Sequence, residues 1–148
     1  MKKIFFLLIL SGILVFCENT NDLKNIRIDQ ISVSDCNTSK GVLSDSIKYK
    51  TIDKNYLSIE HLNSYFNCEP GKLSVNISTG NNTILINEAE EQGSANCICP
   101  YDFKFRIGPM EYGTYNISVT KGGALYVDFV IDFASNTNGG FLVANPDI

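Results

Sequence analysis

The sequence lacks tryptophan altogether and contains a single histidine, His61. It also lacks a Gly-rich phosphate loop, a G-x-S-x-G nucleophile elbow and a cluster of basic residues. One histidine without a placed nucleophile does not make a catalytic triad, so we interpret His61 as a structural or surface residue. The acidic balance and the missing basic cluster argue against nucleic acid as a partner. We therefore expect no enzyme, and we assign no catalytic residue, cofactor or metal ligand.

Carboxylates are frequent, but they form no recognisable site. Glu88, Glu90 and Glu91 fall in segment 87–96, which is acidic and rich in small residues and which we interpret as an exposed loop. This segment lacks the Asp/Asn alternation and the turn glycine of a calcium loop. Asp128 and Asp132 form another pair, without any sign that they line a cleft.

The N-terminus has the pattern of an export signal. Two lysines follow the initiator methionine, and a short apolar run extends to Phe16. This run is shorter than the roughly 20 residues that a membrane-spanning helix needs, so we expect a signal peptide over 1–16. The following residues, Leu14-Val15-Phe16-Cys17, resemble the lipobox of bacterial lipoproteins, although Phe16 stands where a small residue is usual. The resemblance implies lipidation of Cys17. An uncleaved anchor and an ordinary secretory signal are the alternatives.

Removing residues 1–16 leaves ten basic and sixteen acidic residues, a formal charge of −6. We expect a lipidated tether over 17–22, one domain over 23–134 and a C-terminal tail over 135–148 that adds one edge strand at most. Segment 35–55 reads as a long connection that holds one edge strand.

The stretch 97–107 organises the domain. Cysteines, aromatic residues and Ile107 occupy its odd positions, and Asp102, Lys104 and Arg106 occupy even ones. Successive side chains of a strand point to opposite faces, so the odd positions should face the core and Lys104 and Arg106 should face solvent. The same alternation predicts that Asp128 is exposed. It also predicts a set of buried residues in other strands: Val75, Ile77, Ile117, Val119, Val127, Phe129 and Ile131.

Short alternating segments separated by turn signals predict an all-β, antiparallel sandwich of about seven strands. A phase slip at Asp29-Gln30 between two alternating runs indicates either a β-bulge or a break between two short strands. Residues 107–119 resemble the fibronectin type III stretch around the tyrosine corner, which makes Tyr115 the corner tyrosine of an immunoglobulin-like fold. The alternative is that Tyr115 is an ordinary half-buried strand residue.

Four segments together resemble a group of small gut-bacterial lipoproteins of unknown function. They are 66–70, 84–88, 97–102 and 113–115, within a stretch of about 56–120. Members of this group often carry a doubled cysteine where this chain has Cys68-Glu69, so this chain lacks one. The resemblance implies an envelope address and an immunoglobulin-like sandwich, and it carries no activity.

Four cysteines remain after Cys17, and an exported chain favours disulfides over zinc or free thiols. They are Cys36, Cys68, Cys97 and Cys99. In immunoglobulin order, 56–66 and 97–107 become antiparallel neighbours, so Cys68 should bond to Cys97 or Cys99, with Cys99 preferred. The remaining cysteine would pair with Cys36.

The leading hypothesis is a non-enzymatic binding or accessory module at the bacterial cell envelope. Its lipid would hold it to a membrane, with the outer membrane as the expected location and the side left open, and an envelope protein or a glycan is the candidate partner. A purely structural envelope lipoprotein is the alternative. A hydrolase or a metal-binding protein ranks below both, because fold alone does not define function.

Overall fold

The computed structural model describes residues 23–37 and 44–143, which hold nine β-strands and one short 3-10 helix, η1 (Leu23–Asn25). The strands are β1 (Arg27–Val33), β2 (Ser46–Ile52), β3 (Tyr56–Asn67), β4 (Leu73–Gly80), β5 (Thr83–Glu90), β6 (Ile98–Gly108), β7 (Gly113–Lys121), β8 (Ala124–Phe133) and β9 (Asn138–Leu142). No helix in these two ranges is long and apolar enough to cross a membrane. The predicted signal peptide 1–16, Cys17 and the tether 17–22 lie outside the described residues.

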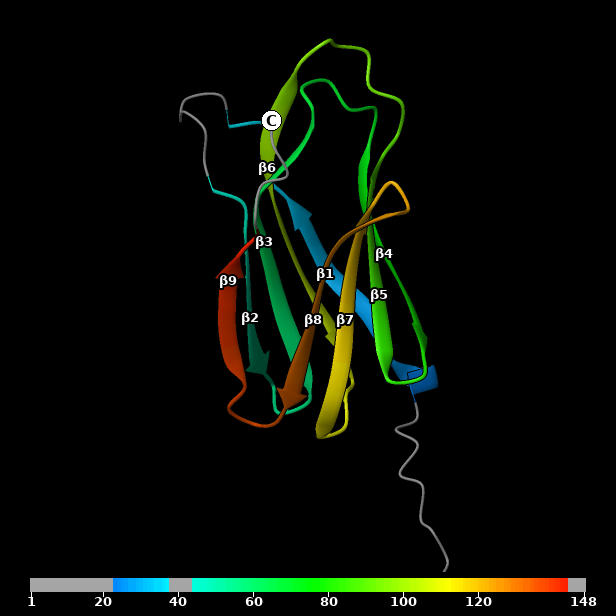
Figure 1. The fold of residues 1–148 in the computed structure, drawn as a ribbon, viewed down its shortest axis with the longest axis vertical. Helices are drawn as coiled ribbons and strands as arrows, with labels where there is room; N and C mark the ends of the chain where they lie inside the picture. Colours follow the sequence, from blue (N-terminus) through cyan, green and yellow to red (C-terminus); the bar gives the residue numbers. More distant parts are fainter. Residues whose placement is uncertain (1–22, 38–43, 144–148) are drawn as a thin grey trace, which may run out of the picture.

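The strands form two sheets that pack face to face, which confirms the predicted all-β sandwich (Figure 1). One sheet has the order β1-β6-β3-β2-β9 and the other has the order β4-β5-β7-β8. The expected antiparallel neighbours 56–66 and 97–107 are strands β3 and β6. The structure differs from the expectation in strand number and in one pairing, because β5 and β7 run parallel. The chain crosses to the other sheet through β6 between them, and parallel neighbours require such a crossover.

Alternation from Cys99 to Ile107 is as predicted, whereas Cys97, which precedes β6 and was also expected to face the core, is exposed. Phe103, Phe105 and Ile107 are at most 3% exposed, whereas Lys104 is exposed. The other residues expected in the core are either buried (Val75, Ile117, Val119, Ile131) or half-buried against it (Ile77, Val127, Phe129).

Arg106 points away from the core as expected, but its side chain is only 20% exposed. Its guanidinium donates hydrogen bonds to both carboxylate oxygens of Asp29 and to Asp53, and it lies 4.4 Å from the ring centroid of Tyr56. The hydrogen bonds with Asp29 lower the pKa of this carboxyl group. Neighbouring strands therefore cover a cation that alternation alone places in solvent.

Tyr115 forms the predicted tyrosine corner. Its ring is 1% exposed, and its hydroxyl donates a hydrogen bond to the carbonyl oxygen of Glu111 at 2.9 Å. This bond ties the connection between β6 and β7 to the beginning of β7, where the chain enters the second sheet.

Strands β1 and β9 form the two edges of the five-stranded sheet. The phase slip predicted at Asp29-Gln30 is a register shift between β1 and β6, with Gln30 at a φ of 51°. The strand expected at the edge within 35–55 is β2, which instead lies between β3 and β9. The sheet edge belongs to β9, which lies in the predicted tail 135–148.

Candidate functional site

A cluster of charged side chains lies between the two sheets. His61 of β3 is 1% exposed, and its two ring nitrogens face two carboxylates. Nε2 lies 2.7 Å from Oδ1 of Asp45, and Nδ1 lies 2.8 Å from Oε1 of Glu88. Both carboxylates belong to residues that are 0% exposed. We call His61, Asp45, Glu88 and the two residues added below, Lys121 and Tyr126, the interior charge cluster.

Strand geometry brings the first three residues together. His61 continues the inward-facing positions of β3 that Leu57 and Ile59 begin. Glu88 does the same in β5 after two buried isoleucines. Asp45 directly precedes β2, and its backbone carbonyl accepts a hydrogen bond from the Val143 amide at 3.0 Å. The two carboxylates therefore approach the imidazole from different sheets.

Lys121 and Tyr126 complete the cluster from β7 and β8. The Lys121 ammonium lies 3.6 Å from Oδ2 of Asp45 and 3.7 Å from the centroid of the Tyr126 ring. The Tyr126 hydroxyl donates a hydrogen bond to the same Asp45 oxygen at 2.5 Å. Ser64, which faces inward after a register shift in β3, donates to Glu88 at 3.1 Å. Two cations thus face two carboxylates, and the buried charges balance.

Electrostatics keeps His61 protonated at neutral pH. Burial by itself lowers the pKa of His61, but the hydrogen bonds to Asp45 and Glu88 outweigh it and raise this pKa to about 9. Burial opposes ionisation of Asp45, yet His61, Tyr126 and Lys121 together lower its pKa. Burial lowers the pKa of Lys121. The pKa of Tyr126 is raised, mainly by burial and to a lesser extent by its hydrogen bond to Asp45.

This arrangement links the two sheets through the side chains of His61, Asp45 and Glu88. A general base needs a free nitrogen lone pair, whereas both nitrogens of His61 donate to carboxylates. Ser64 donates to Glu88, so the geometry of a Ser-His pair is not formed. Within the described ranges, no group of three or more His, Cys, Asp or Glu side chains could hold a metal ion. His61 is therefore buried with both ring nitrogens engaged, and the surface position that the sequence left open is wrong.

The prediction of an exposed acidic loop over 87–96 is partly wrong. Strand β5 continues to Glu90, and Glu88 points into the core. Glu90 and Glu91 are exposed, as expected. Glu88 follows Ile84 and Ile86 at inward positions, so the alternation contained this signal, and the acidic composition of the segment obscured it.

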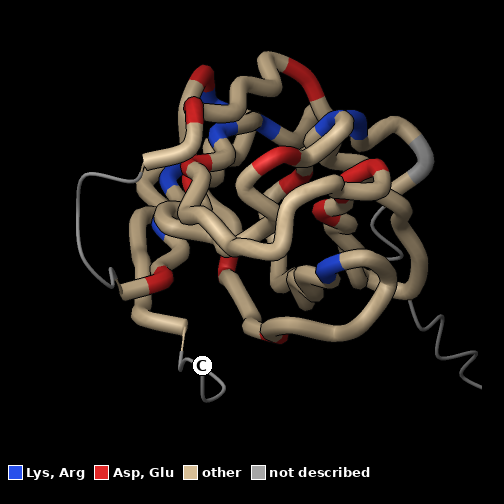
Figure 2. Tube along the Cα trace, turned by 90° about the horizontal axis from the view of Figure 1, so that it is seen from above, with Lys and Arg blue, Asp and Glu red and all other residues tan. Residues whose placement is uncertain are grey.

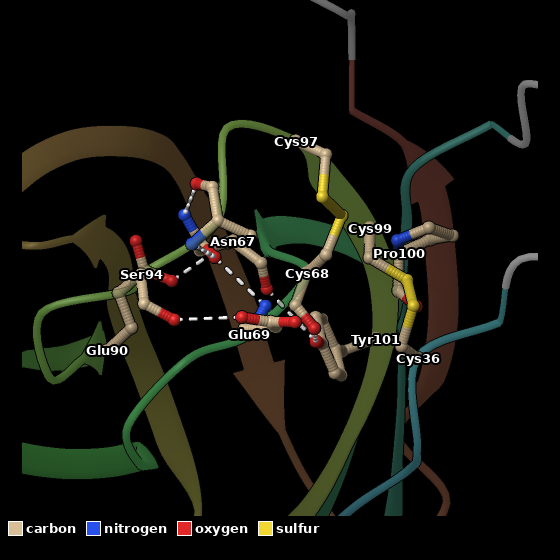
Figure 3. Close-up of a disulfide and its surroundings, with 11 residues drawn as sticks. Cys36, Asn67, Cys68, Glu69, Glu90, Ser94, Cys97, Cys99, Pro100 and Tyr101 are labelled. Carbon is tan, nitrogen blue, oxygen red and sulfur yellow. Dashed lines mark hydrogen bonds between the residues drawn. A yellow bond between two sulfur atoms is a disulfide. The ribbon is translucent and has the colours of Figure 1, made fainter.

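The cysteines form two disulfides, Cys36–Cys99 and Cys68–Cys97, with Cα atoms 5.7 and 5.6 Å apart (Figure 3). The preference for a bond between Cys68 and Cys99 is wrong. Cys99 pairs in register with Phe66 inside the sheet and is 1% exposed, whereas Cys97 precedes β6 and lies beside the end of β3. The Cys68 amide donates to the Cys97 carbonyl at 3.2 Å, which fixes this pairing. The two bonds join β6 to the ends of both neighbouring strands.

Asn67 organises the loop beside the exposed disulfide (Figure 3). Its side chain donates to the Ala95 carbonyl at 2.7 Å and accepts from the Glu69 amide at 2.9 Å. Its backbone amide donates to Glu90, and its carbonyl accepts from the Tyr101 hydroxyl. The loop 91–97 is thus held by polar contacts as well as by the disulfide.

Comparison of the chain with protein-family models, with curated proteins and with solved structures finds no match.

Proposed function

We propose that this protein is a lipid-anchored, non-enzymatic binding or accessory module of the bacterial cell envelope, with the outer membrane as its location. Support for export comes from the basic and apolar segment 1–16 together with the two disulfides, which persist in oxidising compartments. Support for anchoring comes from the position of Cys17 behind a lipobox-like sequence.

The anchor would also orient the domain. The chain enters the sandwich at η1, at the end of the molecule opposite the two disulfides (Figure 1). Residues 18–22 span about 20 Å when fully extended, since each residue contributes at most about 3.6 Å. A lipid on Cys17 would therefore keep the η1 end close to the membrane and turn the disulfide end and the sides of the sandwich toward partners.

The observation that carries the binding role is the exposure of large apolar side chains on one strand. Leu125 and Val130 of β8 are 68% and 63% exposed. Leu142 of β9 is also 70% exposed, but it lies on the outer face of the other sheet. A purely structural lipoprotein gains nothing from these side chains, whereas a partner surface of protein or glycan would cover them.

Two experiments test the proposal in the native envelope. Mass spectrometry of the mature protein should find diacylglycerol on Cys17, and Cys17→Ser should abolish it. A mature N-terminus at another residue would overturn the anchoring. For binding, a photo-crosslinking residue in place of Val130 should give a discrete adduct. The same residue in place of Ser78, exposed on β4, is the control, and adducts from neither position would favour the purely structural role.

A further inference from the structure

Each sheet ends in two edge strands, and three of these four are protected. Strand β1 carries a register shift next to Gln30, which is in the left-handed region at a φ of 51°. Strand β9 has five residues, of which two are glycine. Strand β4 contacts η1, and Thr79 donates to the Leu23 carbonyl at 3.2 Å. Bulges, short length and covering segments are the usual means of blocking an edge.

Strand β8 is the exception. It has ten residues and pairs only with β7 among the described strands. From Val127 to Phe133 the pairing with β7 is regular, because the register shift lies before it, between Val119 and Thr120. Alternate residues of an antiparallel edge strand direct their amide and carbonyl groups away from the sheet, so this segment offers a row of unpaired backbone groups.

The outward face of this segment reads Asp128, Val130, Asp132. The neighbouring strand β7 holds both carboxylates in place, since Ser118 donates to Asp128 and Thr114 donates to Asp132, both at 2.7 Å. The other outward positions of this sheet are uncharged Ser, Thr, Asn, Ala, Gly and Leu residues in the register of β4, β5 and β7.

The two outer faces of the sandwich therefore differ in charge. Viewed along its long axis, the molecule carries most of its Lys and Arg positions in one half (Figure 2). The outward face of the other sheet includes Lys48, Lys50 and Lys104 in the register of β2, β3 and β6. The β8 edge thus carries two acidic residues on a face without a described cation to neutralise them.

This charge pattern argues against a second copy of the chain as the occupant. Antiparallel self-pairing centred on Val130 would set Asp128 directly opposite Asp132 of the other copy. Any register that keeps both outward faces together would collect four carboxylates on one side of the joined sheet. Like charges in cross-strand positions destabilise pairing, whereas opposite charges stabilise it.

We propose that residues 127–133 of β8 form an acceptor edge for an extended segment of a partner polypeptide with Lys or Arg at positions i and i+4 and a small apolar residue at i+2. The partner backbone would extend the sheet by one strand, as in other cases of β-strand addition. Its cations would face Asp128 and Asp132, and its apolar side chain would cover Val130. This inference rests on the proposed binding role and specifies the partner surface.

Binding of a designed peptide tests the edge directly. The probe is a fluorescently labelled Thr-Lys-Thr-Val-Thr-Lys-Thr peptide with blocked ends, and the control carries Glu in place of both Lys residues. With the full chain in detergent, fluorescence anisotropy should detect binding of the Lys peptide that weakens as salt rises, and no binding of the Glu peptide. Hydrogen exchange should show new protection confined to 124–133. Equal binding of both peptides, no binding, or protection elsewhere would overturn the proposal.

Charge reversal provides the matched variants. The double substitution Asp128→Lys and Asp132→Lys should weaken binding of the Lys peptide about tenfold and create binding of the Glu peptide. Glu69→Lys with Glu91→Lys reverses two exposed acids away from this face and should change neither affinity. If the β8 variant folds poorly, Asp128→Asn with Asp132→Asn should reduce the affinity for the Lys peptide by a smaller factor. A concentration-dependent dimer that the β8 variants abolish would instead identify a second copy as the occupant and overturn the proposal.

The outcome is separable from that of the proposed function. Peptide binding does not depend on the lipid, so a chain without diacylglycerol on Cys17 can still confirm the edge. Conversely, Cys17 could be lipidated and Val130 could crosslink to a partner while the chain binds neither peptide. That result would retain the proposed envelope role and contradict only the inferred mode of recognition.

Discussion

His61 and Glu88 meet across the interface between the two sheets, with Nδ1 of the imidazole 2.8 Å from Oε1 and 3.0 Å from Oε2 of the carboxylate. Because Asp45 holds the other ring nitrogen, the imidazolium bridges two buried anions. Buried charges of this kind contribute little when complete, but the removal of one partner leaves the others without compensation.

His61→Ala should therefore destabilise the domain strongly. We expect a loss of about 3–5 kcal/mol in the free energy of unfolding, because two buried carboxylates would lose their shared partner. Urea denaturation followed by circular dichroism measures this loss. Glu60→Ala is the control, since the neighbouring Glu60 contacts Lys104 at 3.8 Å on the outer face and should cost about 0.5 kcal/mol or less. Equal effects of the two substitutions would contradict the role of the interior charge cluster.

Stability should fall on the alkaline side of neutrality. The pKa of His61 is raised from 6.5 to about 9 in the folded state, so its contribution is complete below pH 6.5 and disappears as pH rises through 9. The shift corresponds to about 3 kcal/mol. Asp45 has a lowered pKa, so its contribution holds above its ordinary value of 3.8 and is lost as pH falls below it. Urea midpoints from pH 5 to 9 should show the alkaline decline, and a flat profile would disagree with a protonated His61.

The disulfides should differ in their response to mild reduction. Cys97 is exposed and Cys99 is 1% exposed, so a reductant should reach the Cys68–Cys97 bond first. Alkylation and mass spectrometry of the native protein should label Cys68 and Cys97, and Cys36 and Cys99 should react only after denaturation. Peptide mapping without reduction checks the connectivity. Loss of the 29-residue link should cost about 2–4 kcal/mol.

Core packing provides a prediction that does not depend on charge. Phe105 is 3% exposed in the middle of β6, and Phe105→Ala should cost about 3–5 kcal/mol because it leaves a cavity in the core between the two sheets. The adjacent Lys104→Ala removes an exposed side chain and should stay within about 0.5 kcal/mol. Thermal unfolding of both variants provides the comparison. A larger effect at Lys104 would mean that the alternation of β6 has the opposite phase.

The alternation of apolar and polar residues predicted the sandwich class and which face of each strand points to the core. The inward phase of β6 follows from its local pattern, whereas the pairing of β3 with β6 was predicted from immunoglobulin strand order and the corner at Tyr115 from a resemblance to fibronectin type III. The parallel pairing of β5 with β7 could not be predicted in this way, because it depends on how the connections cross between sheets. The prediction that β2 lies at the sheet edge was wrong for a related reason, since its second neighbour, β9, comes from the distant C-terminal segment.

Local sequence patterns could not predict the contacts within the interior charge cluster. The inward positions of His61 and Glu88 were readable from their strands, but their contact spans 27 residues of sequence. Asp45 precedes its strand and Lys121 ends one, so neither has a pattern that indicates burial. A buried charge is stable only beside its partners, and those partners come from strands whose pairing the sequence did not reveal.

The Cys36–Cys99 bond would have a mechanical consequence if the proposed lipid on Cys17 holds the domain by its N-terminus. A pull on that lipid would act first on η1 and β1, whose hydrogen bonds to β6 can separate. Unravelling then stops at Cys36, because the sulfur bridge passes the load to Cys99 within β6. Thirteen residues, 23–35, span at most about 45 Å, and β1 already covers much of that length as a strand, so the N-terminal segment can separate from β6 with little lengthening before the covalent link carries the force.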